Sequence, residues 1–240
     1  MTQLQGFISD NADIHSGLIS NKALIYGKSS IEKNTILDPF VIIGYPVRSK
    51  TKELISKDEE KFSIETMFDR ISSGSIIGKN CHIRSFTIIY ESSSLEKNVE
   101  TGTNVVIREK CHIGSGSIIG SSTVLDSGVE IGKNARIQSS NFIPPKIVLG
   151  DNVFLGPGVR FANDKYPVSS KLISTVVEDN VMIGIGAIIL PGLKIGMGTV
   201  IGAGSIVTKN IERNSVVVGT PAKQIMTKED YEKKKRDYEK

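Results

Sequence analysis

The sequence has few of the residues on which several common functions depend. Its 240 residues include two cysteines, three histidines and no tryptophan, and the formal net charge is only +4. No run approaches the 18 or so consecutive apolar residues of a membrane span, and no charged-then-apolar segment at the N-terminus indicates a secretory signal. We therefore expect a soluble, cytoplasmic protein with no membrane partner.

Nucleic-acid binding, metal binding and a disulfide are also disfavoured. No basic stripe carries interleaved aromatic residues, so we predict no nucleic-acid partner. Metal ligands must converge, and His15, His82 and His112 fall in three unrelated stacking columns of the repeat described below, so we predict no metal. Cys81 and Cys111 both occupy small inward positions of that repeat, which favours two buried thiols over a disulfide pair.

What the sequence does contain is a six-residue repeat. From residue 77 to residue 161 every sixth residue is apolar except Thr101, and a second, mostly small residue follows each by four positions. Neither the helical period of 3.6 nor a two-residue alternation requires this spacing. A hexapeptide repeat is typical of a parallel β-helix, in which short strands coil around a prism. We therefore predict an all-β parallel β-helix that begins near residue 7.

Two insertions interrupt the repeat. The first, residues 45–75, is charged and lacks hexads, and we predict a solvated loop with at most one short helix or hairpin. The second, residues 162–176, ends where the hexads restart in a new phase at Val177. The predicted organisation is one β-helix domain over residues 1–225 and a helical tail over 226–240, in which Glu232 and Arg236 have the four-residue spacing of a helical ion pair.

Stacking separates structural from functional candidates. With three hexads per coil, residues eighteen apart stack about 4.8 Å apart. One such column contains only Asn and Gly, which tolerate left-handed backbone at a sharp corner: Asn80, Asn98, Gly116, Asn134 and Asn152. After the second insertion we predict the same corner role for Asn180, Gly186, Gly192, Gly198, Gly204 and Asn210.

Other columns are candidates for function. Thr103 and Asn104 begin two adjacent columns of mostly small polar residues, which include Ser139 and admit either turn chemistry or a functional ladder. Asn163 stands in line with Glu109 rather than with the corner asparagines, so it is the stronger functional candidate. A strip without side chains, where a long ligand could lie against backbone amides, is predicted at Gly184, Gly186, Gly202 and Gly204, although corner geometry alone explains Gly186 and Gly204.

Three segments resemble the hexapeptide-repeat acyltransferases, in particular the nucleotide-sugar N-acetyltransferases: IRSFTIIYESSSLEKNVETGTNVVIRE, IQSSNFIPPKIVLGDNVFLGPGVRFANDKYP and ILPGLKIGMGTVIGAGSIVTKNIERNSVVVGTPAKQI. The likeness covers roughly residues 77–225, and the NDKYP and GTPAK segments are its most specific parts. It implies a left-handed β-helix, a homotrimer with the site between subunits, acetyl-CoA as co-substrate, and a UDP- or dTDP-linked amino sugar as acceptor.

With such a site in view, we also predict roles for particular residues. Asn104 is predicted to orient the sugar amine or polarise the thioester, and Glu109 to act as acceptor or base. Substrate contacts are predicted for Thr103, Ser139, Asn163, Asp164 and Tyr166. Cofactor contacts are predicted for Gly184, Gly186, Gly202, Gly204, Lys209 and Lys223.

Thr103 departs from the family pattern, because many relatives carry a histidine there that could serve as general base. An amine is nucleophilic once deprotonated and needs less help than a hydroxyl, so the departure favours N-acetylation through proximity of amine and thioester. Two alternatives stay open: O-acetylation of a sugar or serine hydroxyl, and a non-catalytic structural solenoid. A zinc-dependent carbonic anhydrase on the same fold is disfavoured, because its three histidines would have to converge.

Overall fold

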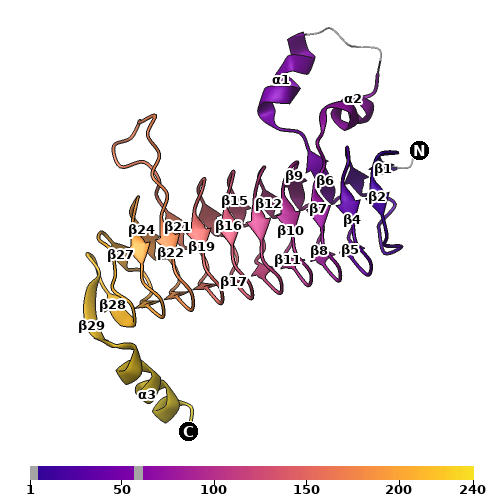
Figure 1. Cartoon of the computed structure of the whole chain (residues 1–240). Helices are drawn as coiled ribbons and strands as arrows, with labels where there is room; N and C mark the ends of the chain where they lie inside the picture. The colour runs from indigo at the N-terminus through magenta and orange to yellow at the C-terminus, as the bar shows by residue number, and fades with distance from the viewer. Residues whose placement is uncertain (1–4, 57–61) are drawn as a thin grey trace.

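Each hexad forms a strand of about two residues followed by a sharp turn, and three hexads complete one coil. The computed structural model describes residues 5–56 and 62–240. In it, successive coils stack into a left-handed parallel β-helix with three long sheets, from which two insertions project on one side (Figure 1). Neighbours within a sheet are three strands apart in sequence, as expected when every coil contributes one strand to each face.

Sheet A contains ten described strands, in the order β1 (Phe7–Ile8), β3 (Leu24–Ile25), β6 (Ile42–Tyr45), β9 (Ile88–Tyr90), β12 (Val106–Ile107), β15 (Val124–Leu125), β18 (Phe142–Ile143), β21 (Arg160–Phe161), β24 (Ile188–Ile189) and β27 (Ile206–Val207). Sheet B contains nine, in the order β2 (Asp13–Ile14), β4 (Ser30–Ile31), β7 (Ile76–Ile77), β10 (Ser94–Leu95), β13 (His112–Ile113), β16 (Glu130–Ile131), β19 (Val148–Leu149), β22 (Val176–Val177) and β25 (Lys194–Ile195).

Sheet C contains ten described strands, in the order β5 (Ile36–Leu37), β8 (His82–Ile83), β11 (Glu100–Thr101), β14 (Ile118–Ile119), β17 (Arg136–Ile137), β20 (Phe154–Leu155), β23 (Met182–Ile183), β26 (Val200–Ile201), β28 (Ser215–Val218) and β29 (Lys223–Thr227). All of its pairings are parallel except the last, because β29 folds back antiparallel on β28. This hairpin leads into α3 (Lys228–Tyr238), which extends from the C-terminal end of the rod (Figure 1).

The core is the inward column predicted from the hexads. The second residue of nearly every strand points inward and is fully buried, from Ile25 to Val207. Thr101, the polar exception, accepts a hydrogen bond at Oγ1 from the backbone N–H of Arg84 (3.0 Å). Cys81 and Cys111 are free and buried, as predicted, and burial raises the pKa of the Cys111 thiol to about 12.

The three corners of the prism are named here by the sheets they join: the B–C edge, the C–A edge and the A–B edge. The predicted Asn and Gly column lies on the B–C edge, with φ between +55° and +71° from Asn80 to Asn152. Its side-chain amides bond from coil to coil, as between Asn80 Nδ2 and Asn98 Oδ1 (3.2 Å). The corner role predicted for Asn210 is wrong, since this residue is not left-handed and its Oδ1 accepts from the Lys194 N–H (2.9 Å).

Both insertions leave from the A–B edge, after β6 and after β21 (Figure 1). The first contains two helices, α1 (Arg48–Ser56) and α2 (Ile64–Ile71), where at most one was predicted. The predicted insertion also includes residues 57–61, which lie outside the described part of the chain. Aromatic contacts seat α2 on the coils, because Phe68 packs edge-on against Tyr26 and Tyr45.

The second insertion is an open hairpin-like loop. Asp164 and Leu172 form an antiparallel bridge, and the Ile173 N–H donates to the Asn163 carbonyl (2.8 Å). Val176 already belongs to β22, so the coil resumes one residue earlier than predicted. In α3 the expected pair of Glu232 with Arg236 is replaced by Lys228 and Glu232, whose charged atoms are 2.8 Å apart. Within the described residues, no helix is long and apolar enough to cross a membrane.

Candidate functional site

The predicted site residues lie on two different edges, one on each side of sheet A. The C–A edge carries Thr103, Asn104, Ser139, Gly184, Gly186, Gly202 and Gly204. Glu109, Asn163 and Lys209 share one column on the A–B edge, and Asp164 and Tyr166 belong to the loop that leaves from it. The remaining residue, Lys223, begins β29 opposite Val218.

Asn104 and Glu109 therefore do not meet within one chain. They flank β12 and are five residues apart, a separation of about 16 Å in an extended strand. Because both flank the same strand, they sit at the same height along the axis of the rod. Asn163 lies three coils further along the Glu109 column, or about 14 Å.

Asn104 occupies a left-handed corner (φ +56°), and its backbone N–H donates to the Ser85 carbonyl (3.0 Å). The left-handed backbone thus explains why position 104 is an asparagine, as it does for the B–C corner asparagines, although the Asn104 side chain is exposed. The neighbouring Thr103 is held by Ser121, whose Oγ lies 3.1 Å from the Thr103 backbone nitrogen and 3.4 Å from its hydroxyl. No group that could act as a strong base stands beside them on this edge in the adjacent coils, which carry Ser85, Phe86, Ser121 and Ser122.

Glu109 is held in a fixed orientation by its neighbour. Arg108 donates to both carboxylate oxygens (3.0 and 3.3 Å), and its guanidinium lies 4.9 Å from the centre of the Tyr90 ring. A carboxylate engaged in this way can still accept a hydrogen bond, but its charge is already balanced. Glu109 is therefore better suited to orienting a donor group than to removing a proton.

The loop residues have distinct environments. Asp164 accepts hydrogen bonds from the backbone N–H groups of Tyr166 (3.0 Å) and Ser169 (2.9 Å), so its carboxylate shapes the loop itself. Tyr166 is 74% exposed and stands free of the coils. Asn163 is half-buried at the root of the loop. Of these three, Asn163 is the one whose position is set by the rigid coil.

The glycine strip has structural causes of two kinds. A Cβ at Gly184 would approach the Ala203 backbone nitrogen to 2.6 Å, so close stacking of coils excludes a side chain there. At Gly204 a Cβ would meet nothing within 4 Å, and only the φ of +65° favours glycine. Gly184 and Gly202 also line a hollow of 610 Å³ between sheet C and α3.

The lysines predicted to accompany this strip lie apart from one another. Lys209 and Lys223 are both exposed, and they stand on opposite sides of the last coil. The structure therefore places Lys223 near the glycines of the C–A edge and Lys209 near the Glu109 column.

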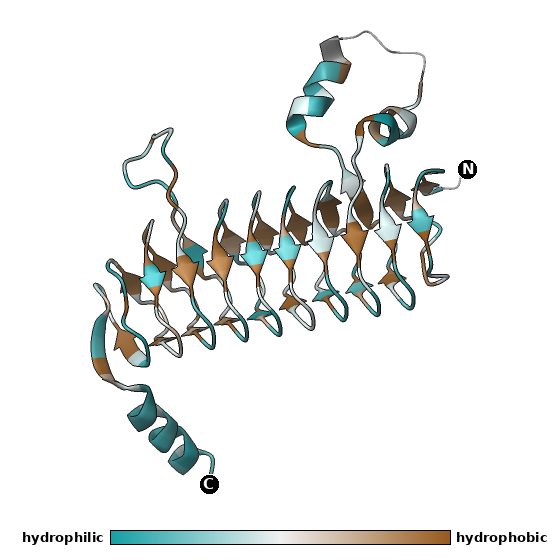
Figure 2. Cartoon of the chain, in the orientation of Figure 1, coloured by the Kyte–Doolittle hydropathy of each residue, from teal (hydrophilic) through white to brown (hydrophobic). Residues whose placement is uncertain are grey.

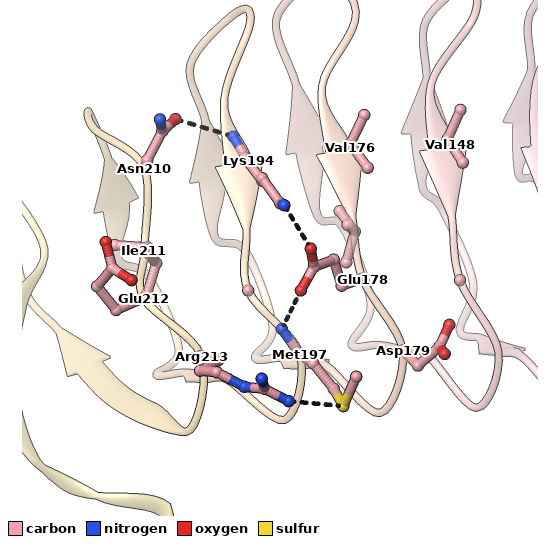
Figure 3. Close-up of a pocket in the computed structure, with 13 residues that line it drawn as sticks. Val148, Val176, Glu178, Asp179, Lys194, Met197, Asn210, Ile211, Glu212 and Arg213 are labelled. Carbon is pink, nitrogen blue, oxygen red and sulfur yellow. Dashed lines mark hydrogen bonds and ion pairs between the residues drawn. The ribbon is translucent and has the colours of Figure 1, made fainter.

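A larger hollow, of 730 Å³, lies on sheet B near the C-terminal end and contains none of the predicted residues (Figure 3). Two of its charged groups form an ion pair, in which Glu178 accepts from Lys194 Nζ (2.7 Å) and also from the Met197 N–H (2.8 Å). The hydrogen bond from Lys194, followed by that from Met197, lowers the pKa of Glu178. The Glu178 carboxylate and the Lys194 ammonium are thus committed to each other, and the other charged side chains that line the hollow are Asp179, Glu212 and Arg213.

Some notable residues were missed by counting eighteen positions. His82 Nε2 lies 3.0 Å from Asp38 Oδ1 across adjacent coils of sheet C, and Phe40 stacks on Phe86 on the C–A edge. The first insertion separates these partners by 44 and 46 positions instead of eighteen. The register of the strands on either side of the insertion determines that these residues become neighbours.

The histidines do not form a metal site within the described residues, which contain no cluster of three or more His, Cys, Asp or Glu side chains arranged to hold an ion. His82 lies on sheet C and His112 on sheet B, as the repeat predicted. His112 contacts Ser94 (2.9 Å) and His15 contacts Asp13 (3.0 Å), so each has a local partner.

Comparison with known proteins supports the fold and gives a partial sequence relationship. A family of bacterial transferase hexapeptide repeats matches residues 174–209, and the hexapeptide repeat of succinyl-transferase matches residues 105–139. The UDP-N-acetylglucosamine acyltransferase of Francisella novicida superposes with a TM-score of 0.66 over 97% of this chain and 72% of that one. Since the two are 13% identical, this likeness concerns the fold alone.

Curated relatives share shorter stretches at higher identity. The 2,3,4,5-tetrahydropyridine-2,6-dicarboxylate N-acetyltransferase of Clostridium perfringens is 45% identical over 62 residues, which cover 26% of each chain. The enzyme of the same name from Staphylococcus aureus is 40% identical over 62 residues, again 26% of each chain. The chain thus spans about a quarter of the length of these relatives. Over these coils the chain therefore matches hexapeptide-repeat families and is similar in sequence to N-acetyltransferases.

Proposed function

We propose that the protein is an acetyl-CoA-dependent N-acetyltransferase, which acetylates an amino group on a UDP- or dTDP-linked sugar in a site completed between the subunits of a cytoplasmic homotrimer. The observation that carries this proposal is the division of the site across sheet A. Asn104 and the glycines stand on one edge and Glu109 and Asn163 on the other. Two such edges meet when copies of the chain are placed side by side around an axis parallel to the rod.

The outer face of sheet A is suited to such an assembly. From β12 onward its outward residues are apolar in almost every coil, with Arg160 as the exception: Val106, Val124, Phe142, Ile188 and Ile206. The strands of sheet A are accordingly brown in Figure 2, whereas those of sheet B vary. A long exposed apolar ladder is a sign of an interaction surface. Its flanking edges are the two that carry the predicted residues.

The chemistry requires little from the protein beyond placement. The deprotonated amine attacks the thioester carbonyl, the oxyanion collapses, and CoA leaves as a thiolate that takes up the proton released by the amine. The Asn104 side-chain amide can donate to the developing oxyanion, while Glu109 of the adjacent copy accepts from the amine. Thr103 supplies no base, and this fits an amine better than a hydroxyl acceptor.

The cofactor would lie along the C–A edge. Gly186 and Gly204 leave that edge without side chains over the last coils, within the segment that matches the transferase hexapeptide repeats. Backbone amides are exposed to a ligand where side chains are missing. Lys223, beside the final coil, is placed to meet a phosphate of CoA.

Subunit complementation tests the proposal directly. Asn104→Gly and Glu109→Gln variants are each expected to be inactive in a thiol-release assay with acetyl-CoA and UDP- or dTDP-amino sugars. Unfolding and refolding the two variants together would give mixed trimers with one intact site each, and activity should return to roughly a quarter of the wild-type value. Wild-type controls taken through the same cycle calibrate recovery.

Several results would contradict the proposal. No thiol release by wild-type protein with any amino sugar, together with no binding of acetyl-CoA, would favour a structural solenoid. Release with hydroxyl acceptors alone would favour O-acetylation. Activity that stays absent in mixed trimers would mean that Asn104 and Glu109 serve the same subunit or that one of them is not needed.

A further inference from the structure

Phe40 and Phe86 have an unusual combination of backbone and exposure. Each occupies a left-handed corner with φ +64°, where other coils of the C–A edge have Asn, Ser or Gly. A bulky L-residue is disfavoured there because its Cβ crowds the following carbonyl. The rings are also 37% and 56% exposed, so core burial does not compensate. Neither folding of the corner nor packing of the core explains two phenylalanines at these positions.

The two rings form a stack with one open end. Their centroids are 5.3 Å apart and their planes differ by 9°. The Lys22 ammonium lies over Phe40, 5.4 Å from its centroid, so that ring is contacted on both sides. On the other side of Phe86 the next residue of the column is the smaller Asn104, and Phe86 is more exposed than Phe40. One further planar ring could extend the stack at that point.

The open end of the stack borders a defined hollow. Its volume is 510 Å³, and its floor is formed by the outward residues of sheet A, namely Leu24, Ile42 and Ile88. Glu65 of α2 contributes to the wall, and Asn104 lines the hollow beside Phe86. An apolar floor with an aromatic face and a few polar groups is the usual composition of a small-molecule site.

We propose that this hollow binds the base of a nucleotide, stacked on the free face of Phe86 in continuation of the Phe40 ring. Base stacking on aromatic side chains is favourable for any base, because every base has a π face. The Asn104 amide and the Glu65 carboxylate supply acceptors and donors for the polar edge of the base. The exposed Arg84, two residues before Phe86 on the same edge, supplies positive charge for the phosphates.

This inference rests on the proposed function, since it locates the nucleotide of the nucleotide-linked sugar. In this arrangement Asn104 lies between the nucleobase and the amino group that accepts the acetyl group. It also gives the first insertion a role, because α2 forms one wall of the hollow.

Calorimetric titration of the whole protein without acetyl-CoA tests the inference. The probes are UDP, dTDP, CDP, ADP and GDP, with ribose 5-phosphate as a ligand that lacks a base. At least one nucleotide should bind tenfold or more tightly than ribose 5-phosphate. The Phe86→Asn variant should lose about tenfold in that affinity, while its Tm stays equal or rises because Asn suits the left-handed corner.

Matched variants separate stacking from structural effects. Phe86→Tyr keeps an aromatic face and should retain the affinity, whereas Phe86→Leu keeps an apolar side chain and should lose it. Phe62→Ala removes another exposed phenylalanine, one that does not line the hollow, and should leave binding unchanged. If Phe86→Asn does not fold, the Leu and Tyr pair still decides the question.

The inference is overturned if Phe86→Asn and Phe86→Leu bind nucleotides as tightly as wild type, or if no nucleotide binds better than ribose 5-phosphate. It is also overturned if Phe86→Asn dissociates the oligomer, since the rings would then be a contact between copies. Nucleotide binding that depends on Phe86 in a protein without acetyltransferase activity would contradict only the proposed function. Acetyl transfer with an unchanged KM in Phe86→Asn would contradict only the stacking site.

Discussion

Lys50 of α1 and Glu91 of the coil form an ion pair that ties the first insertion to the β-helix, with Nζ and Oε2 2.6 Å apart. The Glu91 side chain is only 3% exposed. Its oxygens also accept hydrogen bonds from the backbone N–H groups of Val47 (3.0 Å) and Ser73 (2.6 Å). One carboxylate thus holds both the departing and the returning strand of the insertion, which in turn positions α2 beside Asn104.

Replacing this carboxylate should loosen the insertion. Glu91→Ala leaves Lys50 and two N–H groups without their acceptor, and we expect a loss of about 2 kcal/mol, since the ammonium retains some solvent. Hydrogen exchange measured by mass spectrometry should accelerate in α1 and α2 and remain slow in the coils from β12 onward. Glu130→Ala, on the outer face of sheet B, is the control. Uniform acceleration along the rod would contradict the anchoring role.

The same residue predicts a pH dependence. Burial disfavours the ionised form of Glu91, but the hydrogen bonds from Lys50, Val47 and Ser73 outweigh it and lower the pKa. A folded-state pKa below the unfolded value adds stability above the unfolded pKa, which is about 4.3, and this stability is lost as the pH falls through the folded value. The free energy of unfolding, measured by denaturation at intervals from pH 7 to pH 3, should therefore decrease less for Glu91→Gln than for wild type. An equal decrease in the two proteins would show that Glu91 does not contribute to this pH dependence.

The role of the Asn104 side-chain amide can be tested separately from the role of its left-handed backbone conformation. Asn104→Gly retains the left-handed backbone and removes only the side chain, so the fold should persist while kcat falls about 100-fold, as for loss of one oxyanion donor. Asn134→Gly makes the same change at a B–C corner with φ +55° and should leave kcat unchanged. Full turnover by Asn104→Gly would rule out the role proposed for the amide.

The glycine strip makes a prediction about the cofactor. Gly204 can accept a side chain, because a Cβ there meets no atom within 4 Å and Asn tolerates φ +65°. In Gly204→Asn the Tm should be nearly unchanged, while the KM for acetyl-CoA rises about tenfold, equivalent to 1.4 kcal/mol of lost binding. Ser140→Asn introduces the same side chain three coils earlier on that edge and serves as the control. An equal KM for acetyl-CoA in wild type, Gly204→Asn and Ser140→Asn would mean that the cofactor does not lie along the glycine strip.

Sheet A should hold the copies together. Val124→Lys places an ammonium in the middle of the apolar ladder, where its desolvation would oppose association. Light scattering coupled to size-exclusion chromatography should show a trimer for wild type and a smaller species for the variant, with loss of acetyl transfer. Glu130→Lys, on the outer face of sheet B, should remain trimeric. A trimeric and active Val124→Lys protein would contradict an interface on this face.

Much of the fold could be predicted because its determinants repeat. The inward column from Ile77 to Phe161 recurs every six residues, and each coil buries the same side chains as its neighbours. The corner asparagines were predictable for the same reason, since each coil must turn at the same three positions. Asn210 was mispredicted because the last turn is not followed by a regular coil that would impose the corner.

Where the hexad repeat is interrupted, the sequence does not indicate which residues become neighbours in space. The stack of Phe40 on Phe86, the pairing of Asp38 with His82 and the anchoring of the insertion by Glu91 all cross the first insertion. Their separation depends on the length of a segment that follows no hexads. Only the register of β6 with β9 and of β5 with β8 aligns them.

The sequence by itself determined the coil, its inward core and the columns in which candidate residues stand, because short-range periodicity specifies which side chains point inward and which stack. Only the tertiary structure decided which edge each column occupies. It separated Asn104 from Glu109 by the width of sheet A, stacked Phe40 on Phe86, and brought the wall formed by α2 to the hollow that Asn104 lines. Those relationships arise from how three faces close into one prism and from where an aperiodic insertion returns, and neither is a property of local sequence.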